Sequence, residues 1–210
     1  MAAGLRYGHL PRQASPMGQP ARQRRATYAD LEAVPPNKVA ELINGTLHVF
    51  PRPAPKHARA SSFLGGKLVG PFSFGEGGPG GWWILDEAEL HFPDPADPGE
   101  IEAVVPDLAG WRRERMPELP EEAFFTLAPD WVCEVLSTST EDVDRDDKMP
   151  IYAREGVRHA WLIDPIARTL ETFVLEGRRW VESETWRDSE RVRVPPFEAI
   201  ELDLSVLWSK

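Results

Sequence analysis

Short apolar runs separated by Pro, Gly and polar clusters dominate the pattern of hydrophobic and polar positions. The clearest signal lies in residues 40–50, where apolar residues flank Asn44-Gly45 on both sides. Asn-Gly favours positive φ at both central positions of a two-residue turn. The pattern therefore predicts a β-hairpin near the N-terminus. A short helix starting at Tyr28 and ended by Pro35-Pro36 is predicted before it.

The next part of the chain alternates between helical and strand patterns. Apolar residues at helical spacing predict a helix over residues 57–69, which a Gly-rich loop over 75–81 follows. One strand is predicted from Trp82 to His91 and another over residues 101–105. Residues 110–129 contain three Pro and are predicted to be irregular.

The second half predicts a strand–helix–strand crossover. Residues 131–136 form a short apolar run with one acid, which is typical of a buried central strand. Ser and Thr at 137–140 can cap a helix over residues 142–155, and Gly156 can end it. A strand over 160–164 follows, and then a meander over 169–175 and 179–184 that turns around Glu176-Gly177. Residues 191–194 and 200–204 close the domain.

This order predicts an α+β fold, with a mixed central β-sheet flanked by helices. We expect one domain over residues 28–210 and a flexible arm over residues 1–27. The first 25 residues hold five Arg and no acid, and they lack the apolar core of a signal peptide. The arm could touch phosphate, but disorder is the simpler interpretation.

Composition narrows the environment of the protein. The chain has 210 residues, 41% hydrophobic and 28% charged, which is ordinary for a globular protein. Its single cysteine, Cys133, excludes an internal disulfide and a cysteine zinc cluster, and it fits a reducing cytoplasm. No apolar run reaches the roughly 18 residues that a membrane span needs. We therefore expect a cytoplasmic protein that does not enter a membrane.

Charge opposes one class of function. The net charge is −10, whereas proteins that bind nucleic acid through phosphate neutralisation usually carry a basic face. A cluster of acids that holds a cation would account for part of the excess, because the metal inverts the local sign.

Glu134 is the first candidate for chemistry. It interrupts the apolar strand of residues 131–136, and a carboxylate there is costly to desolvate unless something binds it. The alternative is a strand with one wet face, but Val132 shares the face of Glu134. A cation or a basic partner explains the position better.

Asp107 and Lys148 gain meaning only beside Glu134. Asp107 follows the apolar run 103–105 and Pro106, at a strand end. Alone it is more often a turn residue, and Lys148 alone is typical of a solvated charge run. Together, two carboxylates can hold Mg²⁺ or Mn²⁺, and a nearby lysine can orient or deprotonate the attacking water. This set suits hydrolysis of a phosphodiester.

Four segments also carry a family resemblance. They are Ala40-Glu-Leu-Ile-Asn-Gly-Thr-Leu47, Val105-Pro-Asp-Leu108, Pro129-Asp-Trp-Val-Cys-Glu-Val-Leu-Ser137, and the stretch from Lys148 to Pro165. On these residues the chain, over about 28–208, resembles the Uma-two family of restriction endonucleases within the PD-(D/E)XK nuclease superfamily. The resemblance implies a restriction-endonuclease-like core, and Asp107 and Glu134 as the two acids that bind metal. It also implies a nucleic acid as partner, DNA above all, and a homodimer, which suits the cutting of two strands.

One position departs from the motif. The motif expects Lys two residues after Glu134, where this chain has Leu136. The resemblance implies that the lysine has migrated to the next helix, as Lys148. Glu41 matches an early acid that adds to the metal site; its alternative is a strand-edge carboxylate. His57 matches a family position, and it could contact substrate or cap its helix.

Three other features have simpler interpretations or two open ones. Asp130 lies four residues before Glu134 and fits a turn better than a ligand. The acidic run Asp142, Asp144, Asp146 and Asp147 lacks the Gly and Glu of a calcium loop and predicts a solvated helix start. Residues 110–116 hold Trp111, Arg112 and Arg113 in a predicted loop. This segment is a candidate phosphate-facing patch, or a dimer contact.

The sequence thus predicts a Mg²⁺- or Mn²⁺-dependent endonuclease in which Asp107, Glu134, Lys148 and Glu41 form the catalytic set. His57, Arg112 and Arg113 are candidates for substrate binding. Two alternatives stay open. One is a non-catalytic module that binds nucleic acid or protein on the same fold. The other is a hydrolase of a small phosphate substrate, which the net charge would tolerate better.

Overall fold

The N-terminal hairpin forms as the sequence predicts. The computed structural model of the protein describes residues 24–209, so most of the predicted arm lies outside the described residues. Helix α1 (Tyr28–Glu32) precedes β1 (Val39–Ile43) and β2 (Thr46–Phe50), which pair antiparallel. Asn44 and Gly45 have φ values of 52° and 70°, as a two-residue hairpin turn requires.

A six-stranded sheet forms the centre of the molecule. Its strands, in spatial order, are β10 (Arg179–Arg187), β9 (Thr169–Glu176), β8 (His159–Asp164), β7 (Trp131–Val135), β6 (Leu108–Arg112) and β3 (Trp82–Asp86). Strands β7 and β8 pair in parallel, and the other neighbours pair antiparallel. The sheet is therefore mixed, which confirms the predicted fold class.

A smaller sheet holds the hairpin. Its order is β2-β1-β5-β4, with β4 covering Leu90–Pro93 and β5 covering Ile101–Val104. The prediction of one strand from Trp82 to His91 is wrong. Glu87 has φ of 47°, which a strand does not allow, and the chain passes there from the larger sheet to the smaller one.

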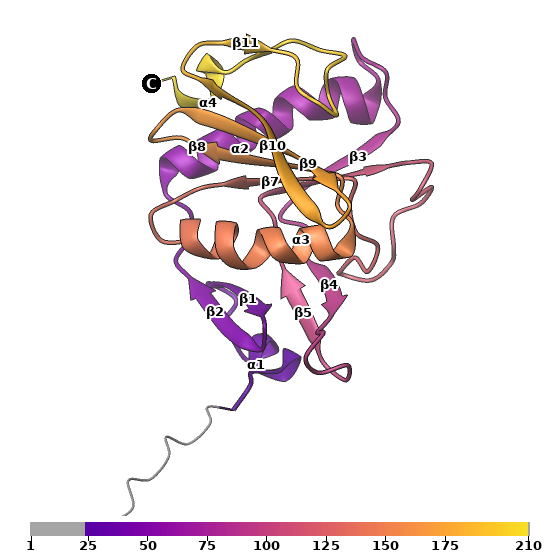
Figure 1. The fold of residues 1–210 in the computed structure, drawn as a ribbon, viewed down its shortest axis with the longest axis vertical. Helices are drawn as coiled ribbons and strands as arrows, with labels where there is room; N and C mark the ends of the chain where they lie inside the picture. Colours follow the sequence, from indigo (N-terminus) through magenta and orange to yellow (C-terminus); the bar gives the residue numbers. More distant parts are fainter. Residues whose placement is uncertain (1–23, 210) are drawn as a thin grey trace, which may run out of the picture.

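Both faces of the six-stranded sheet are covered (Figure 1). One face packs against α2 (Pro55–Leu68), the π-helical η1 (Val69–Phe74) and the C-terminal segments β11 (Arg191–Val192), β12 (Leu202–Asp203) and α4 (Ser205–Trp208). The other face packs against the π-helical η2 (Val143–Lys148), α3 (Met149–Glu155) and the smaller sheet. Figure 1 shows α2 and α3 on opposite sides of the sheet.

Strand β7 shows why its one acid meets the crossover helix. Trp131, Cys133 and Val135 pack into the core on the α2 side, whereas Val132 packs on the α3 side. Successive side chains of a strand point to opposite faces. Glu134 therefore faces α3, and it is buried there as Val132 is.

The prediction that residues 110–129 are irregular fails at its start. Gly110, Trp111 and Arg112 belong to β6, which pairs with both β3 and β7. Trp111 is fully buried, and its indole N–H donates to the carbonyl of Leu127 at 2.8 Å. Trp111 is thus a core residue and cannot face phosphate.

Among residues 24–209, no helix is both long and apolar enough to cross a membrane.

Candidate active site

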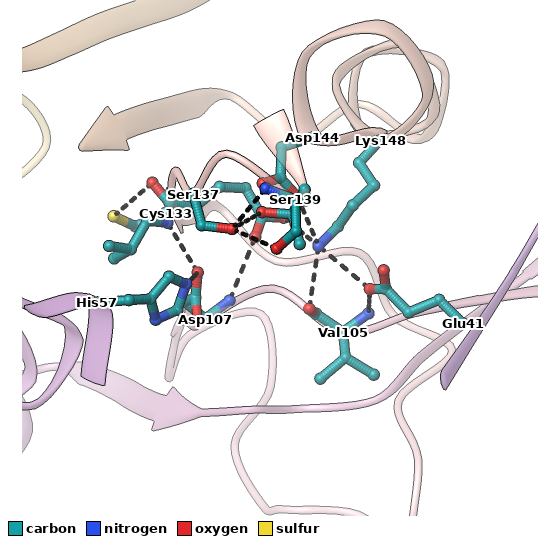
Figure 2. A network of polar contacts seen from close by, with 12 residues as sticks. Glu41, His57, Val105, Asp107, Cys133, Ser137, Ser139, Asp144 and Lys148 are labelled. Carbon is teal, nitrogen blue, oxygen red and sulfur yellow. Dashed lines mark hydrogen bonds and ion pairs between the residues drawn. The ribbon is translucent and has the colours of Figure 1, made fainter. Parts of the chain in front are cut away.

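The four residues predicted as a catalytic set converge from β1, β7, η2 and one connection. Figure 2 shows three of them, Glu41, Asp107 and Lys148, in one network of polar contacts. Glu41 lies on β1 and Glu134 on β7, while Lys148 ends η2. Asp107 lies in the short connection that leads from β5 in the smaller sheet to β6 in the larger one. A cavity of about 440 Å³ opens above them, and Glu41, Asp107 and Lys148 line it.

Lys148 is the hub of this cluster. Its Nζ lies 2.9 Å from Glu134 Oε1, 3.1 Å from Glu41 Oε1 and 3.4 Å from Asp144 Oδ1. It also donates to the carbonyl of Val105 at 3.1 Å. Figure 2 shows the side chain reaching from its helix across to Glu41 and Val105. Lys148 is only 3% exposed, so it is not the solvated lysine that its sequence context alone suggests.

The charge state of Lys148 follows from these neighbours. Burial acts to lower the pKa of the ammonium, but Glu134, Glu41 and Asp144 together raise it well above its ordinary value. Lys148 therefore keeps its proton at any physiological pH. Its ammonium is therefore a fixed positive charge in the cavity floor.

Asp144 corrects one prediction. The acidic run of residues 142–147 was expected to be solvated, but Asp144 is buried and pairs with Lys148 one helical turn away. Burial raises the pKa of its carboxyl, and Lys148 opposes that change. The structure thus adds a third carboxylate to the lysine.

Glu134 is held from two sides. Tyr152, on α3, donates its hydroxyl to Glu134 Oε1 at 2.5 Å, and the backbone N–H of Asp107 lies 3.4 Å from Oε2. Burial raises the pKa of the Glu134 carboxyl, and the adjacent Lys148 charge counteracts part of that. A buried carboxylate of this kind is stable only beside a cation.

Asp107 is fixed reciprocally to the same strand. Its Oδ2 accepts the backbone N–H of Val135 at 2.7 Å, next to Glu134. His57 Nε2, from the first turn of α2, lies 3.3 Å from the same oxygen. Burial acts to lower the pKa of His57, but its hydrogen bond to Asp107 and the charge there raise it overall. His57 Nδ1 is buried and has no hydrogen-bond partner among residues 24–209.

Two residues of the cluster were not predicted from the sequence, Asp144 and Tyr152. They lie four residues before and four residues after Lys148. Residues four apart lie on one face of a helix, so this spacing was a signal that points to the same site. From that face Asp144 pairs with Lys148, and Tyr152 donates to Glu134.

Arg112 and Arg113 lie elsewhere. Arg112 ends β6, at the opposite end from Asp107, and Arg113 follows it. Both line a separate hollow beside Trp82. The Arg112 guanidinium lies 4.6 Å from the ring centre of Trp82, and that of Arg113 lies 3.8 Å from that of Trp83. The structure does not bring either of them to the cavity. Asp130, for which the sequence predicts a turn, is buried and accepts the backbone N–H of Arg112 at 2.9 Å.

The carboxylate oxygens of the site are the type of ligand that a hard divalent cation prefers. Within residues 24–209, no three His, Cys, Asp or Glu side chains are grouped so that they would enclose a metal by themselves. Mg²⁺ does not need such a group, because it usually takes one or two carboxylates and completes its shell with water and phosphate oxygens. Asp107, which lines the cavity, and Glu134 beside it are two such carboxylates.

Comparison with known proteins agrees with this geometry. Residues 25–206 match the model of the Uma2 family, which is described as "putative restriction endonuclease". A crystal structure from Anabaena variabilis, described as "a putative nuclease belonging to DUF820", superposes with a TM-score of 0.68 at 22% identity. The alignment covers 87% of this chain and 97% of the Anabaena chain, which shows a shared fold. No curated protein matches the chain.

Proposed function

The chain belongs to the Uma2 family of restriction-endonuclease-like proteins, and from this premise we propose that it hydrolyses phosphodiester bonds of DNA with the help of Mg²⁺ or Mn²⁺. One observation carries the proposal. Lys148 Nζ lies 2.9 Å from Glu134 and 3.1 Å from Glu41, in the floor of a cavity that Asp107 also lines. A lysine among acids at an open cavity can stabilise the charge that develops in phosphodiester hydrolysis, and the acids can hold the metal ion.

In this proposal Asp107 and Glu134 hold the metal. When bound, a divalent cation polarises a phosphoryl oxygen and makes its bound water a stronger acid. The protein fixes both carboxylates beforehand: Val135 N–H and His57 orient Asp107, and Tyr152 orients Glu134. Orientation by such neighbours typically changes metal affinity or activity by about 10- to 100-fold.

Lys148 supplies a permanent positive charge. Because its pKa is raised, it is not the base that deprotonates water in the state the structure shows. It can instead orient a water molecule and offset negative charge that develops on the phosphate. Glu41 holds the ammonium in place, and its Oε1 also accepts the backbone N–H of Val105 at 2.6 Å.

Cleavage assays test the proposal. Purified protein is incubated with supercoiled plasmid, or with bis(p-nitrophenyl) phosphate, in Mg²⁺, Mn²⁺ or EDTA. We expect metal-dependent nicking, and loss of at least about 100-fold of the activity in Asp107→Asn and Glu134→Gln. Both substitutions keep the shape of the side chain, and Asp164→Asn, on β8, is the matched control.

The outcomes separate the alternatives. Cleavage of the small diester without plasmid cleavage identifies a hydrolase of small phosphate substrates. If the wild type cleaves neither substrate, the alternative of a non-catalytic binding module is favoured. Cleavage that survives in Asp107→Asn and Glu134→Gln contradicts the assignment of the site.

A homodimer and a cytoplasmic location remain predictions. Two copies of the site would be needed to cut both strands of a duplex at once.

A further inference from the structure

The mouth of the cavity carries two cations that the cluster does not use. Lys38 and Arg52 line the cavity and are exposed. Neither forms an ion pair with a carboxylate of residues 24–209, whereas Lys148 pairs with Glu41, Glu134 and Asp144. In a chain with a net charge of −10, two free cations beside an acidic cavity are a local exception.

The hairpin brings these cations to the same end of the smaller sheet. Val39 pairs with Phe50, so the residues just outside this pair, Lys38 and Pro51, leave the hairpin at its open end. Arg52 follows immediately. We call Lys38 and Arg52 the basic rim.

The backbone holds the basic rim in place. Arg52 stands between Pro51 and Pro53, and a residue before proline is confined to extended conformations. The N–H of Lys38 donates to the carbonyl of Pro35 at 3.0 Å, which closes a turn before β1. Little backbone entropy is therefore lost when a ligand binds at the rim.

The cavity is polarised across the smaller sheet. Its order is β2-β1-β5-β4, so the hairpin with the basic rim lies at one edge and β4 at the other. Two acids that line the cavity, Glu87 and Glu89, lie in the segment before β4. An extended anion is attracted toward the hairpin and repelled from the β4 side.

From this polarity, and resting on the proposed function, we infer that the basic rim binds the phosphates that flank the scissile one in a polynucleotide. The acids and Lys148 form the floor of the cavity. Lys38 and Arg52 lie at its mouth, where the nucleic-acid strand would enter. Ser137 to Thr140, which also line the cavity, add hydroxyl groups that can hydrogen-bond to phosphate oxygens. The rim would then select a chain of phosphodiesters over an isolated one.

A binding assay measures the contribution of the rim separately from catalysis. Fluorescence anisotropy measures the affinity of the full-length protein for a labelled DNA duplex and for single-stranded RNA, in Ca²⁺, over a series of salt concentrations. The test variant is Lys38→Gln/Arg52→Gln. The matched control is Lys67→Gln/Arg178→Gln, which removes the same charge from two exposed positions outside the cavity.

We expect the rim variant to bind roughly tenfold more weakly. We also expect it to lower the slope of log K against log salt by about two, one for each lost phosphate contact. The control should bind as the wild type does. Equal weakening in both variants, or in neither, overturns the inference. The two nucleic acids show whether the bound backbone is that of DNA or of RNA.

Kinetics supply a second readout. In the rim variant KM for DNA should rise about tenfold with kcat retained, and hydrolysis of bis(p-nitrophenyl) phosphate should not change, because that diester reaches only the floor. If the protein cuts DNA and the rim variant has an unchanged KM for DNA, the inference about the rim is wrong and the proposed nuclease function stands. If the wild type binds DNA through the rim but cuts no phosphodiester, the proposed nuclease function is wrong and the inference about the rim stands.

Discussion

At the scale of single residues, the Tyr152 hydroxyl is the sharpest test of the cavity floor. It donates to Glu134 at 2.5 Å in a fully buried position. Tyr152→Phe removes that oxygen alone, so Glu134 loses an orienting partner while Lys148 remains. We expect kcat to fall about 10- to 100-fold and the affinity for Mn²⁺, measured by calorimetry, to weaken.

Tyr28→Phe is the control, since Tyr28 lies 3.5 Å from Glu89 and away from Glu134. The melting temperature should change little in either variant. If Tyr152→Phe binds Mn²⁺ and turns over substrate as the wild type does, Tyr152 only fills space.

Single residues also show which parts of the site could be predicted from the sequence. The desolvation cost of one acid in an apolar strand predicts a buried cationic partner for Glu134, and Lys148 lies there. The prediction of a solvated acidic run is wrong for Asp144, because Asp144 lies one helical turn from Lys148 and shares its inward face. Trp111 was misplaced for a similar reason: three later Pro suggested a loop, but pairing with β3 extends the strand.

Within the helices and strands, we expect alanine substitution to have opposite effects on stability at two glycines, one in crowded and one in open surroundings. A Cβ on Gly110, in β6, would lie 3.1 Å from both Ile84 Cδ1 and Trp131 Cε3. A Cβ on Gly66, in the exposed part of α2, would meet nothing within 4 Å. Gly110→Ala should lower the free energy of unfolding by about 1–3 kcal/mol. Gly66→Ala should raise it by about 0.5–1 kcal/mol.

Urea denaturation followed by tryptophan fluorescence measures both changes. A stabilised Gly110→Ala would mean that the sheet can shift to make room, and a destabilised Gly66→Ala would contradict the placement of that helix face.

Most elements could be predicted because their signals are local. The Asn44-Gly45 turn, the crossover from β7 to β8 and the hairpin of β9 and β10 each depend on a few neighbouring residues. The split between β3 and β4 could not be predicted, because alternation continues through residues 82–91. The break at Glu87 arises from pairing with two different sheets, which is a long-range property.

At the scale of the whole molecule, a cation that binds the cavity should stabilise the fold. A ligand that binds only the folded state adds about 1.4 kcal/mol at ten times its Kd. We expect Mg²⁺ to raise the melting temperature of the wild type and to have a smaller effect on Asp107→Asn. Scanning calorimetry at constant ionic strength measures this.

Sodium chloride at equal ionic strength is the control, because a chain with net charge −10 gains some stability from any salt. An equal Mg²⁺ effect in both proteins would locate the bound cation away from Asp107.

The connection that carries Asp107 has a consequence for folding. It joins the two sheets, so Glu41 and Lys148 meet only when the smaller sheet has docked on the larger one. These residues are roughly a hundred positions apart along the chain, and contacts of such separation form slowly because a long loop must close first. A nascent or half-folded chain therefore has no assembled centre. On the proposed function, newly made protein cannot act on nucleic acid until the smaller sheet has docked on the larger one.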